Sequence, residues 1–216
     1  KKALVLQPNY STAQDWYSLY LMIMGRFDEA IKVARHALEL HPLSLNINAV
    51  LGGIYYFAGK NDEAIEQFQK TIEIDSKFSL TYLFQSGALA AQNRVEEAVE
   101  SLKKLVFITA GSPFAMGYLG AGFAVAGQKD EALKMLDQLN ALSKKKYVSP
   151  FYIAMIYLGL GDKERIFEYL EKACEEKESF LAFINTWPLF DSLRSEPKFK
   201  AILKKMGFKP TPHQKK

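Results

Sequence analysis

Four acidic pairs in this chain have the composition of a general acid–base dyad: Asp28 with Glu29, Asp62 with Glu63, Glu96 with Glu97, and Asp130 with Glu131. A catalytic dyad needs one setting of its own, partly buried, so that the pKa values of its two carboxyls separate. These pairs instead recur every 34 residues. Helix starts explain the recurrence, because negative charge is favourable at the positive end of a helix dipole. We therefore expect no catalytic residues among them.

Thiol and metal chemistry have few candidates. The single cysteine, Cys174, excludes an intrachain disulfide and a cysteine-only zinc site, and we expect it to be a small buried hydrophobic residue. The histidines, His36, His41 and His213, are too few and too scattered for a metal cluster. Phosphate-loop, nucleophile-elbow and zinc-protease motifs are absent from the sequence. The sequence predicts no enzyme, no metal and no cofactor.

A 34-residue period organises the chain. A small residue follows each acidic pair at this interval, and a fifth step reaches an isoleucine: Ala30, Ala64, Ala98, Ala132 and Ile166. Five residues upstream, a glycine or asparagine keeps the same interval: Gly25, Gly59, Asn93, Gly127 and Gly161. Internal repeats of this length are typical of helical solenoids.

Each repeat has the features of two helices joined by a tight turn. An apolar stretch, such as residues 51–58, precedes each glycine or asparagine. Gly or Asn just past a helix end adopts the left-handed conformation that ends the helix, and the acidic pair then opens the next one. The alanine column lets the two helices approach closely, and Pro42 stops the second helix of its unit. We call the two helices A and B.

This pattern resembles the tetratricopeptide repeat over about residues 1–180. The resemblance rests on these residues: Gly25, Ala30, Ala37 and Pro42; Leu51, Gly52, Tyr55, Gly59, Ala64 and Phe68; Leu119, Gly120, Phe123, Gly127 and Ala132; Ile153, Ala154, Tyr157, Gly161 and Ala173. It implies an all-α, right-handed superhelical solenoid of antiparallel helix pairs. The five expected units are residues 11–44, 45–78, 79–112, 113–146 and 147–180. Gln85, Ser86 and Asn93 depart from the family pattern, and Ile166 is expected to loosen the fifth hairpin.

The two ends of the chain differ from the repeats. Ala3 and Pro8 keep the 34-residue phase, so residues 1–10 are interpreted as the end of a truncated preceding repeat. Residues 181–208 are expected to form diverged capping helices, with Pro188 in a first turn and Ser195 as an N-cap. Residues 209–216 are expected to be a flexible basic tail.

The segment 190–199 is also similar to one bacterial group of tetratricopeptide-repeat regulators. In that group the repeats follow an N-terminal signalling or DNA-binding domain. The resemblance implies a bacterial regulator whose effector domain lies upstream of these residues.

The basic net charge of +4 does not indicate nucleic-acid binding. Residues 198–216 hold seven lysines and no acid, so residues 1–197 carry a net charge of −3. The lysines lack the interleaved aromatics or arginine cluster of a nucleic-acid surface. No signal peptide and no stretch of about 20 apolar residues is present, which favours a cytoplasmic protein without a membrane span.

The resemblance places helix A on the concave face of the solenoid, and the 100° helical step gives the residues that point toward it. Asp15 is the one charged residue in that set. The twelve candidate peptide-binding residues are Asp15, Trp16, Leu19, Asn46, Phe57, Leu83, Phe84, Phe114, Tyr118, Phe151, Tyr152 and Met155. An apolar, aromatic groove of this kind fits a partner helix or apolar peptide.

Other readings of these residues stay open. An aromatic stripe at helical spacing is more often repeat-to-repeat core than a ligand site. The lysine and arginine clamp with which some family members bind acidic chaperone C-termini is missing, so we expect no such ligand. The function predicted is a protein–protein interaction scaffold. The alternative is a sensory or oligomerisation module of a bacterial regulator, with the groove filled by its own chain or by a second copy.

Overall fold

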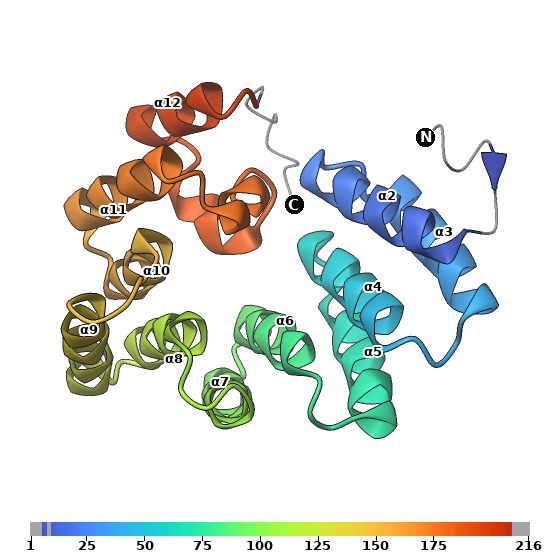
Figure 1. The fold of residues 1–216 in the computed structure, drawn as a ribbon, viewed down its shortest axis with the longest axis horizontal. Coiled ribbons are helices and arrows are strands. Elements are labelled where there is room, and N and C mark those ends of the chain that lie inside the picture. The colour runs from blue at the N-terminus through green and yellow to red at the C-terminus, as the bar shows by residue number, and fades with distance from the viewer. Residues whose placement is uncertain (1–5, 8–9, 209–216) are drawn as a thin grey trace. The chain divides into compact units, whose positions relative to one another are not determined.

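The computed structural model describes residues 6–7 and 10–208, and all regular elements assigned within them are helices. Figure 1 labels the helices from α2 to α12 in chain order. The all-α class predicted from the sequence is confirmed. Most of residues 1–10 and all of the tail 209–216 lie outside the described residues. The helix pairs are α2 (Ser11–Ile23) with α3 (Phe27–Leu40), α4 (Leu45–Phe57) with α5 (Asn61–Ile74), α8 (Pro113–Val125) with α9 (Lys129–Ser143), and α10 (Pro150–Leu160) with α11 (Lys163–Glu175). Helices α6 (Ser79–Ala91) and α7 (Val95–Ile108) follow one another in the chain between α5 and α8.

The turns between helices A and B have the predicted geometry. Gly25, Gly59, Gly127 and Gly161 all have φ between 72° and 75°. Asn93, which departs from the glycine pattern, adopts φ 61° and ends its helix in the same way. Asparagine tolerates this left-handed region better than other non-glycine residues. An acidic residue stands in the first turn of every helix B, as expected from the helix dipole.

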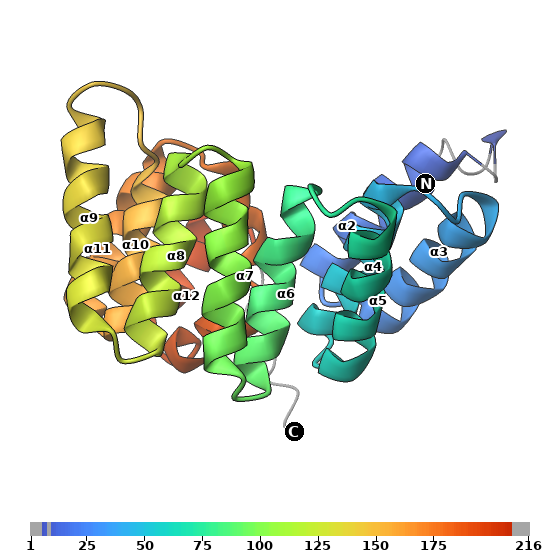
Figure 2. The same cartoon turned by 90° about the horizontal axis from the view of Figure 1, so that it is seen from below.

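The chain forms two compact units, residues 1–93 and residues 94–216, which we call unit 1 and unit 2. In unit 1, α2 packs on α3, α4 packs on α5, and α6 contacts both α4 and α5. Figure 2 shows α4 and α5 side by side. The helix B alanines, Ala30 and Ala64, are fully buried, which permits the close approach predicted from the sequence.

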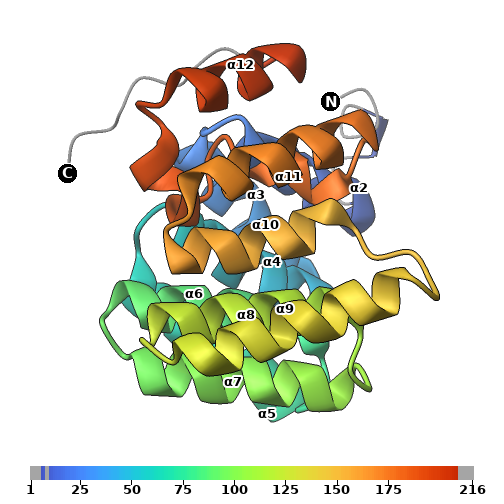
Figure 3. The same ribbon diagram turned by 90° about the vertical axis from the view of Figure 1, so that its left-hand side faces the viewer.

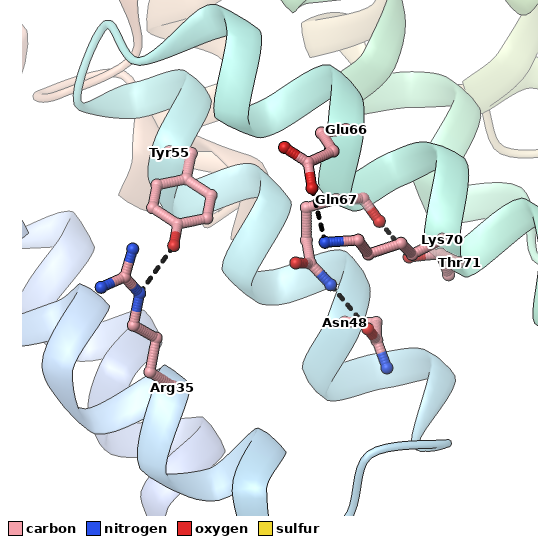
Figure 4. A network of polar contacts seen from close by, with 7 residues as sticks. All are labelled: Arg35, Asn48, Tyr55, Glu66, Gln67, Lys70 and Thr71. Carbon is pink, nitrogen blue, oxygen red and sulfur yellow. Dashed lines mark hydrogen bonds and ion pairs between the residues drawn. The ribbon is translucent and has the colours of Figure 1, made fainter.

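A buried polar network in unit 1 holds the turn before α4 in place (Figure 4). Asn48 Nδ2 donates to the backbone oxygens of Pro42 at 2.9 Å and Ser44 at 2.8 Å. Its Oδ1 accepts from Gln67 Nε2 at 2.6 Å, and Thr71 Oγ1 donates to the Gln67 carbonyl at 3.0 Å. Because a buried polar group without a partner is costly, this network fixes α4 against α5 and the preceding turn.

In unit 2, α8 packs on α7, α9 and α10, and α10 packs on α11 (Figure 3). Ile166, in the alanine column, is buried between helices that still pack as a pair, so the loosening expected there is not seen. Two 3₁₀ helices follow, η1 (Ser179–Phe183) and η2 (Pro188–Leu193), and then α12 (Pro197–Lys205). Pro188 begins η2 as predicted, but the prediction of Ser195 as an N-cap was wrong, because Glu196 holds that position.

Candidate functional site

The structure divides the twelve candidate groove residues by exposure. Trp16 and Asn46 are exposed, and Leu19, Phe114 and Tyr152 are half-buried. The remaining seven are buried: Asp15, Phe57, Leu83, Phe84, Tyr118, Phe151 and Met155. A partner can therefore reach only some of these side chains without displacing others. The accessible pair, Trp16 and Asn46, belongs to unit 1.

In unit 1 the accessible positions lie on α2 and α4. Trp16 leaves 68% of its surface exposed, although tryptophan is usually highly buried. Asn46, on α4, donates from Nδ2 to Asp15 Oδ2 at 2.5 Å. This bond links α2 to α4 at Asp15, the residue that precedes Trp16 in the sequence. The pair offers what a peptide site needs, an apolar surface next to a polar group that can fix orientation.

Asp15 has an unfavourable electrostatic setting. Only 6% of it is exposed, and its Oδ1 has no hydrogen-bond partner among the described residues. Burial raises the pKa of Asp15 to about 6, and the hydrogen bond from Asn46 acts in the opposite direction. The carboxylate is therefore ionised at neutral pH at a cost to stability. It is also the one charged residue in the five A helices, which contain no lysine or arginine.

The corresponding positions in unit 2 are covered by the chain's own C-terminal segment. The Phe180 ring lies 5.3 Å from Phe114 and stacks on Phe151 at 6.3 Å between centroids. The Trp187 ring lies 6.0 Å from Tyr118, and Phe190 stacks on Phe151 at 6.3 Å. Residues 179–193 thus cover part of the candidate surface of α8 and α10, where Tyr118 and Phe151 are buried and Phe114 is half-buried. Aromatic pairs at these spacings contribute beyond the area they bury.

Arg194 holds this C-terminal segment together. Its guanidinium donates to the backbone oxygens of Asn185 and Trp187, the latter at 3.0 Å, and to Asp191 Oδ1 at 2.7 Å. The guanidinium thus donates to two carbonyls of the turn between η1 and η2 and to the Asp191 carboxylate of η2. The segment is therefore a folded part of unit 2 rather than a loose strap.

Small residues in the A helices serve the packing of one helix A on the next. A Cβ on Gly117 would lie 2.9 Å from the backbone oxygen of Tyr152, and one on Gly159 would lie 2.7 Å from the backbone oxygen of Ala121. In unit 1, the Phe84 ring lies over Gly53 and meets Phe57 edge-on at 6.0 Å. The backbone that Gly117 and Gly159 admit belongs to a neighbouring helix of the same chain.

The acidic pairs, the histidines and Cys174 are not brought together into a site among the described residues. Among the described residues, no group of three or more His, Cys, Asp or Glu could hold a metal ion. Cys174 is half-buried, whereas the sequence predicted a buried side chain. Glu29 and Glu97, from two acidic pairs, make exposed ion pairs with Arg26 and Arg94.

The sequence analysis did not predict that residues 179–193 pack on α8 and α10. A signal for it exists, because Phe180, Phe183, Trp187 and Phe190 recur at spacings of three, four and three. This is the period of one helical face. Pro188 interrupts the spacing, and the segment folds as two 3₁₀ turns that still present these rings to one side.

Comparison with known proteins agrees with this geometry. Residues 21–82 and 153–180 match models of the tetratricopeptide repeat. A tetratricopeptide-repeat protein of Thermus thermophilus superposes with a TM-score of 0.64 at 19% identity, covering 83% of this chain and 98% of that one. PilW, a type IV pilus biogenesis factor, gives 0.62 at 18% identity, covering 94% and 86%. YrrB, a repeat protein with an unusual peptide-binding site, gives 0.51 at 19% identity, covering 84% and 94%.

At these identities the superpositions show the fold alone. No curated protein matches the chain in sequence. The chain therefore contains tetratricopeptide repeats and has an α-solenoid fold. The similarity of residues 190–199 to bacterial regulators is not supported by the matches described above. Among the described residues, no helix is long and apolar enough to cross a membrane.

Proposed function

Starting from tetratricopeptide repeats in an α-solenoid, we propose that this chain is a protein-interaction scaffold that binds an apolar peptide or helix through unit 1. The observation that carries the proposal is the exposed side chain of Trp16, the residue that follows Asp15 on α2, while Asp15 accepts a hydrogen bond from Asn46 on α4. Tryptophan is among the residues that most often dominate binding energy at interfaces. In unit 2 the equivalent face is occupied by the chain's own aromatic rings.

The charge of the A helices narrows the class of partner. They contain no lysine or arginine and one carboxylate, Asp15. An acidic C-terminus or a nucleic-acid backbone would meet no cation there, and both ligands depend on cationic contacts. The fitting partner is an uncharged or weakly basic segment with a large apolar side chain for Trp16. Its backbone would be oriented by the Asn46 amide.

Selection from a random peptide display library on the whole chain tests this proposal. The selected peptide is expected to bind Trp16→Ala at least about 30-fold more weakly, as for a tryptophan at the centre of an interface. Phe107→Ala is the matched control, because Phe107 is 87% exposed and lies in unit 2. Peptides that bind Trp16→Ala as tightly as the unaltered chain, or a library that yields no binder, would reject the proposal.

The alternative, a sensory or oligomerisation module of a regulator, is favoured by a different observation. Residues 179–193 occupy the face of α8 and α10, as expected for a groove filled by its own chain. Such a module would transmit a signal by moving that segment. Trp187 is the reporter for this, because a ligand that displaced it would expose the indole and shift its fluorescence to longer wavelength.

A further inference from the structure

Asp15 differs in kind from the residues that the repeat register places at its position. Its counterparts at successive 34-residue steps are all apolar and buried: Ala49, Leu83, Gly117 and Phe151. Asp15 is buried as well, with 6% of its surface exposed, but it carries a carboxylate. The packing of one helix A on the next therefore does not require an acid here, and an apolar side chain would cost less free energy. A buried charge that packing does not need is a candidate for ligand binding.

The Asp15 carboxylate is directed toward α4. Its Oδ2 accepts from Asn46 Nδ2 of α4 at 2.5 Å, and its Oδ1 has no hydrogen-bond partner among the described residues. The 100° helical step puts Tyr17 and Met24 about 160° and 180° around the helix axis from Asp15. The carboxylate thus lies on the side of α2 that the following helix A occupies, and described residues define its surroundings there.

The hydrogen bonding of this carboxylate is incomplete. An ionised carboxyl accepts at both of its oxygens, whereas here the one donor among the described residues is the neutral amide of Asn46. The five A helices contain no lysine or arginine that could offset the charge. Buried charges in proteins are normally paired with an opposite charge or bind a cation. The missing group is therefore a positively charged donor.

We propose that Asp15 binds a cationic group of the peptide partner, either a lysine or arginine side chain or the amine of the peptide N-terminus. This inference rests on the function proposed above and names the group that the partner carries beside its apolar side chain. Asn46 is exposed, so its amide can rotate away from Asp15 and leave the carboxylate to a charged donor, which forms the stronger hydrogen bond. The Asn46 amide is then free to bind the peptide backbone.

This role predicts opposite effects of one substitution on stability and on binding. Asp15→Asn removes a charge that burial disfavours, so the folded chain should become more stable. The same substitution removes the partner of the ligand cation, so affinity for the peptide should fall. A residue that serves only the packing of α2 on α4 would not show this combination, because its loss would weaken both stability and binding.

Peptides selected from a random display library on the whole chain at neutral pH test the assignment. The selected peptides are expected to share one lysine, arginine or free N-terminal amine at a fixed spacing from a large apolar residue. Asp15→Asn should bind them at least about 10-fold more weakly, the effect of losing a hydrogen bond to a charged group. Equal affinity of Asp15→Asn and the unaltered chain would overturn the proposal.

Asp137→Asn is the matched control for the change in net charge. Asp137 is exposed on α9 in unit 2, so the substitution removes the same charge away from the site. It should leave the affinity for the selected peptides unchanged. A loss in Asp137→Asn equal to that in Asp15→Asn would show a general attraction of basic peptides and contradict a specific contact.

Changes in the peptide identify the source of the cation without altering the protein. Norleucine in place of lysine, citrulline in place of arginine, and acetylation of the N-terminus each remove one positive charge. One of these changes should weaken binding to the unaltered chain by at least about 10-fold and have little effect on binding to Asp15→Asn, since the two groups act as a pair. Losses that simply add in the doubly altered complex would place the cation elsewhere and reject the contact.

Failure of this inference is distinguishable from failure of the peptide site. Selected peptides that require Trp16 but bind Asp15→Asn as tightly as the unaltered chain would overturn the cation contact and leave the peptide site in place. Peptides that bind Trp16→Ala and Asp15→Asn without loss, or a library that yields no binder, would reject both proposals together.

Discussion

Asp15 is the one charged residue in the five A helices, and its burial disfavours the ionised form of the carboxyl. Its carboxyl is buried, one oxygen accepts from Asn46 at 2.5 Å, and the other oxygen lacks a partner among the described residues. With a folded pKa of about 6 against an ordinary value of 3.8, the folded chain binds the proton more tightly than the unfolded chain. By linkage, the protonated Asp15 carboxyl makes its full contribution to the free energy of unfolding below pH 3.8. That contribution is lost as the pH rises through 6 and the carboxyl ionises.

Asp15→Asn is therefore expected to stabilise the protein at neutral pH, by at most about 3 kcal/mol, because the amide keeps an acceptor for Asn46 and carries no charge. The gain should shrink as the pH falls from 7 toward 4, where the wild-type carboxyl is protonated. Urea unfolding of both chains at several pH values measures this, and the difference between them cancels the titration of other groups. A gain that stays constant with pH would contradict the raised pKa.

Residue-scale sequence reasoning succeeds where the cause is local. The left-handed turn at Gly25, and even at Asn93, follows from backbone sterics that the sequence displays directly. The direction of the groove residues also follows from the helical step. Their exposure does not, because the helical step assigns Phe151 and Trp16 to the same face of helix A. One is buried by Phe180 and Phe190, and the other is exposed.

At the scale of elements, the closeness of neighbouring A helices is set by which atoms face each glycine. Between α8 and α10, the atoms facing Gly117 are the Cβ, Cα and backbone oxygen of Tyr152. These cannot move without moving the helix. Between α4 and α6, Gly53 faces the ring of Phe84 at an ordinary contact distance of 3.4 Å. The two glycines look alike in the sequence but stand in different contacts.

Substitution of each glycine by alanine should have opposite effects. Gly117→Ala is expected to destabilise unit 2 by about 2 kcal/mol or more, because the overpacking exceeds the helix-propensity gain of about 1 kcal/mol. Gly53→Ala should be neutral or stabilising by up to about 1 kcal/mol. Chemical denaturation compares the two variants directly. Equal effects at the two sites would show that backbone contact between α8 and α10 does not set their separation.

The predictable elements are those that obey the repeat. The A and B helices, α2 to α11, follow from the 34-residue columns. The positions of η1, η2 and the rings they carry follow from contacts remote in sequence. Nothing local identifies Phe114 as the partner of Phe180, 66 positions further along the chain. The sequence indicates an apolar face near the end of the chain, and folding determines which surface it covers.

At the scale of the whole molecule, repeat proteins gain stability mainly from contacts between neighbouring units, so distant parts can open separately. This chain consists of two compact units, residues 1–93 and 94–216. Unit 2 has the larger share of aromatic packing, through the segment that carries Phe180, Trp187 and Phe190. A defect in that packing should therefore be confined to unit 2.

Trp187→Ala tests this independence. Removal of a buried tryptophan is expected to cost about 3–5 kcal/mol. Hydrogen exchange in peptides from α8, α10 and α11 should then accelerate about 100-fold or more, while α4 and α5 stay unchanged, because Trp187 packs against the rings of Tyr118, Phe183 and Phe190 in unit 2. Phe107→Ala, an exposed site in unit 2, should leave both sets unchanged. Equal acceleration in α4 and α5 would mean that the chain opens as one cooperative unit, and the two compact units would then have no separate stability.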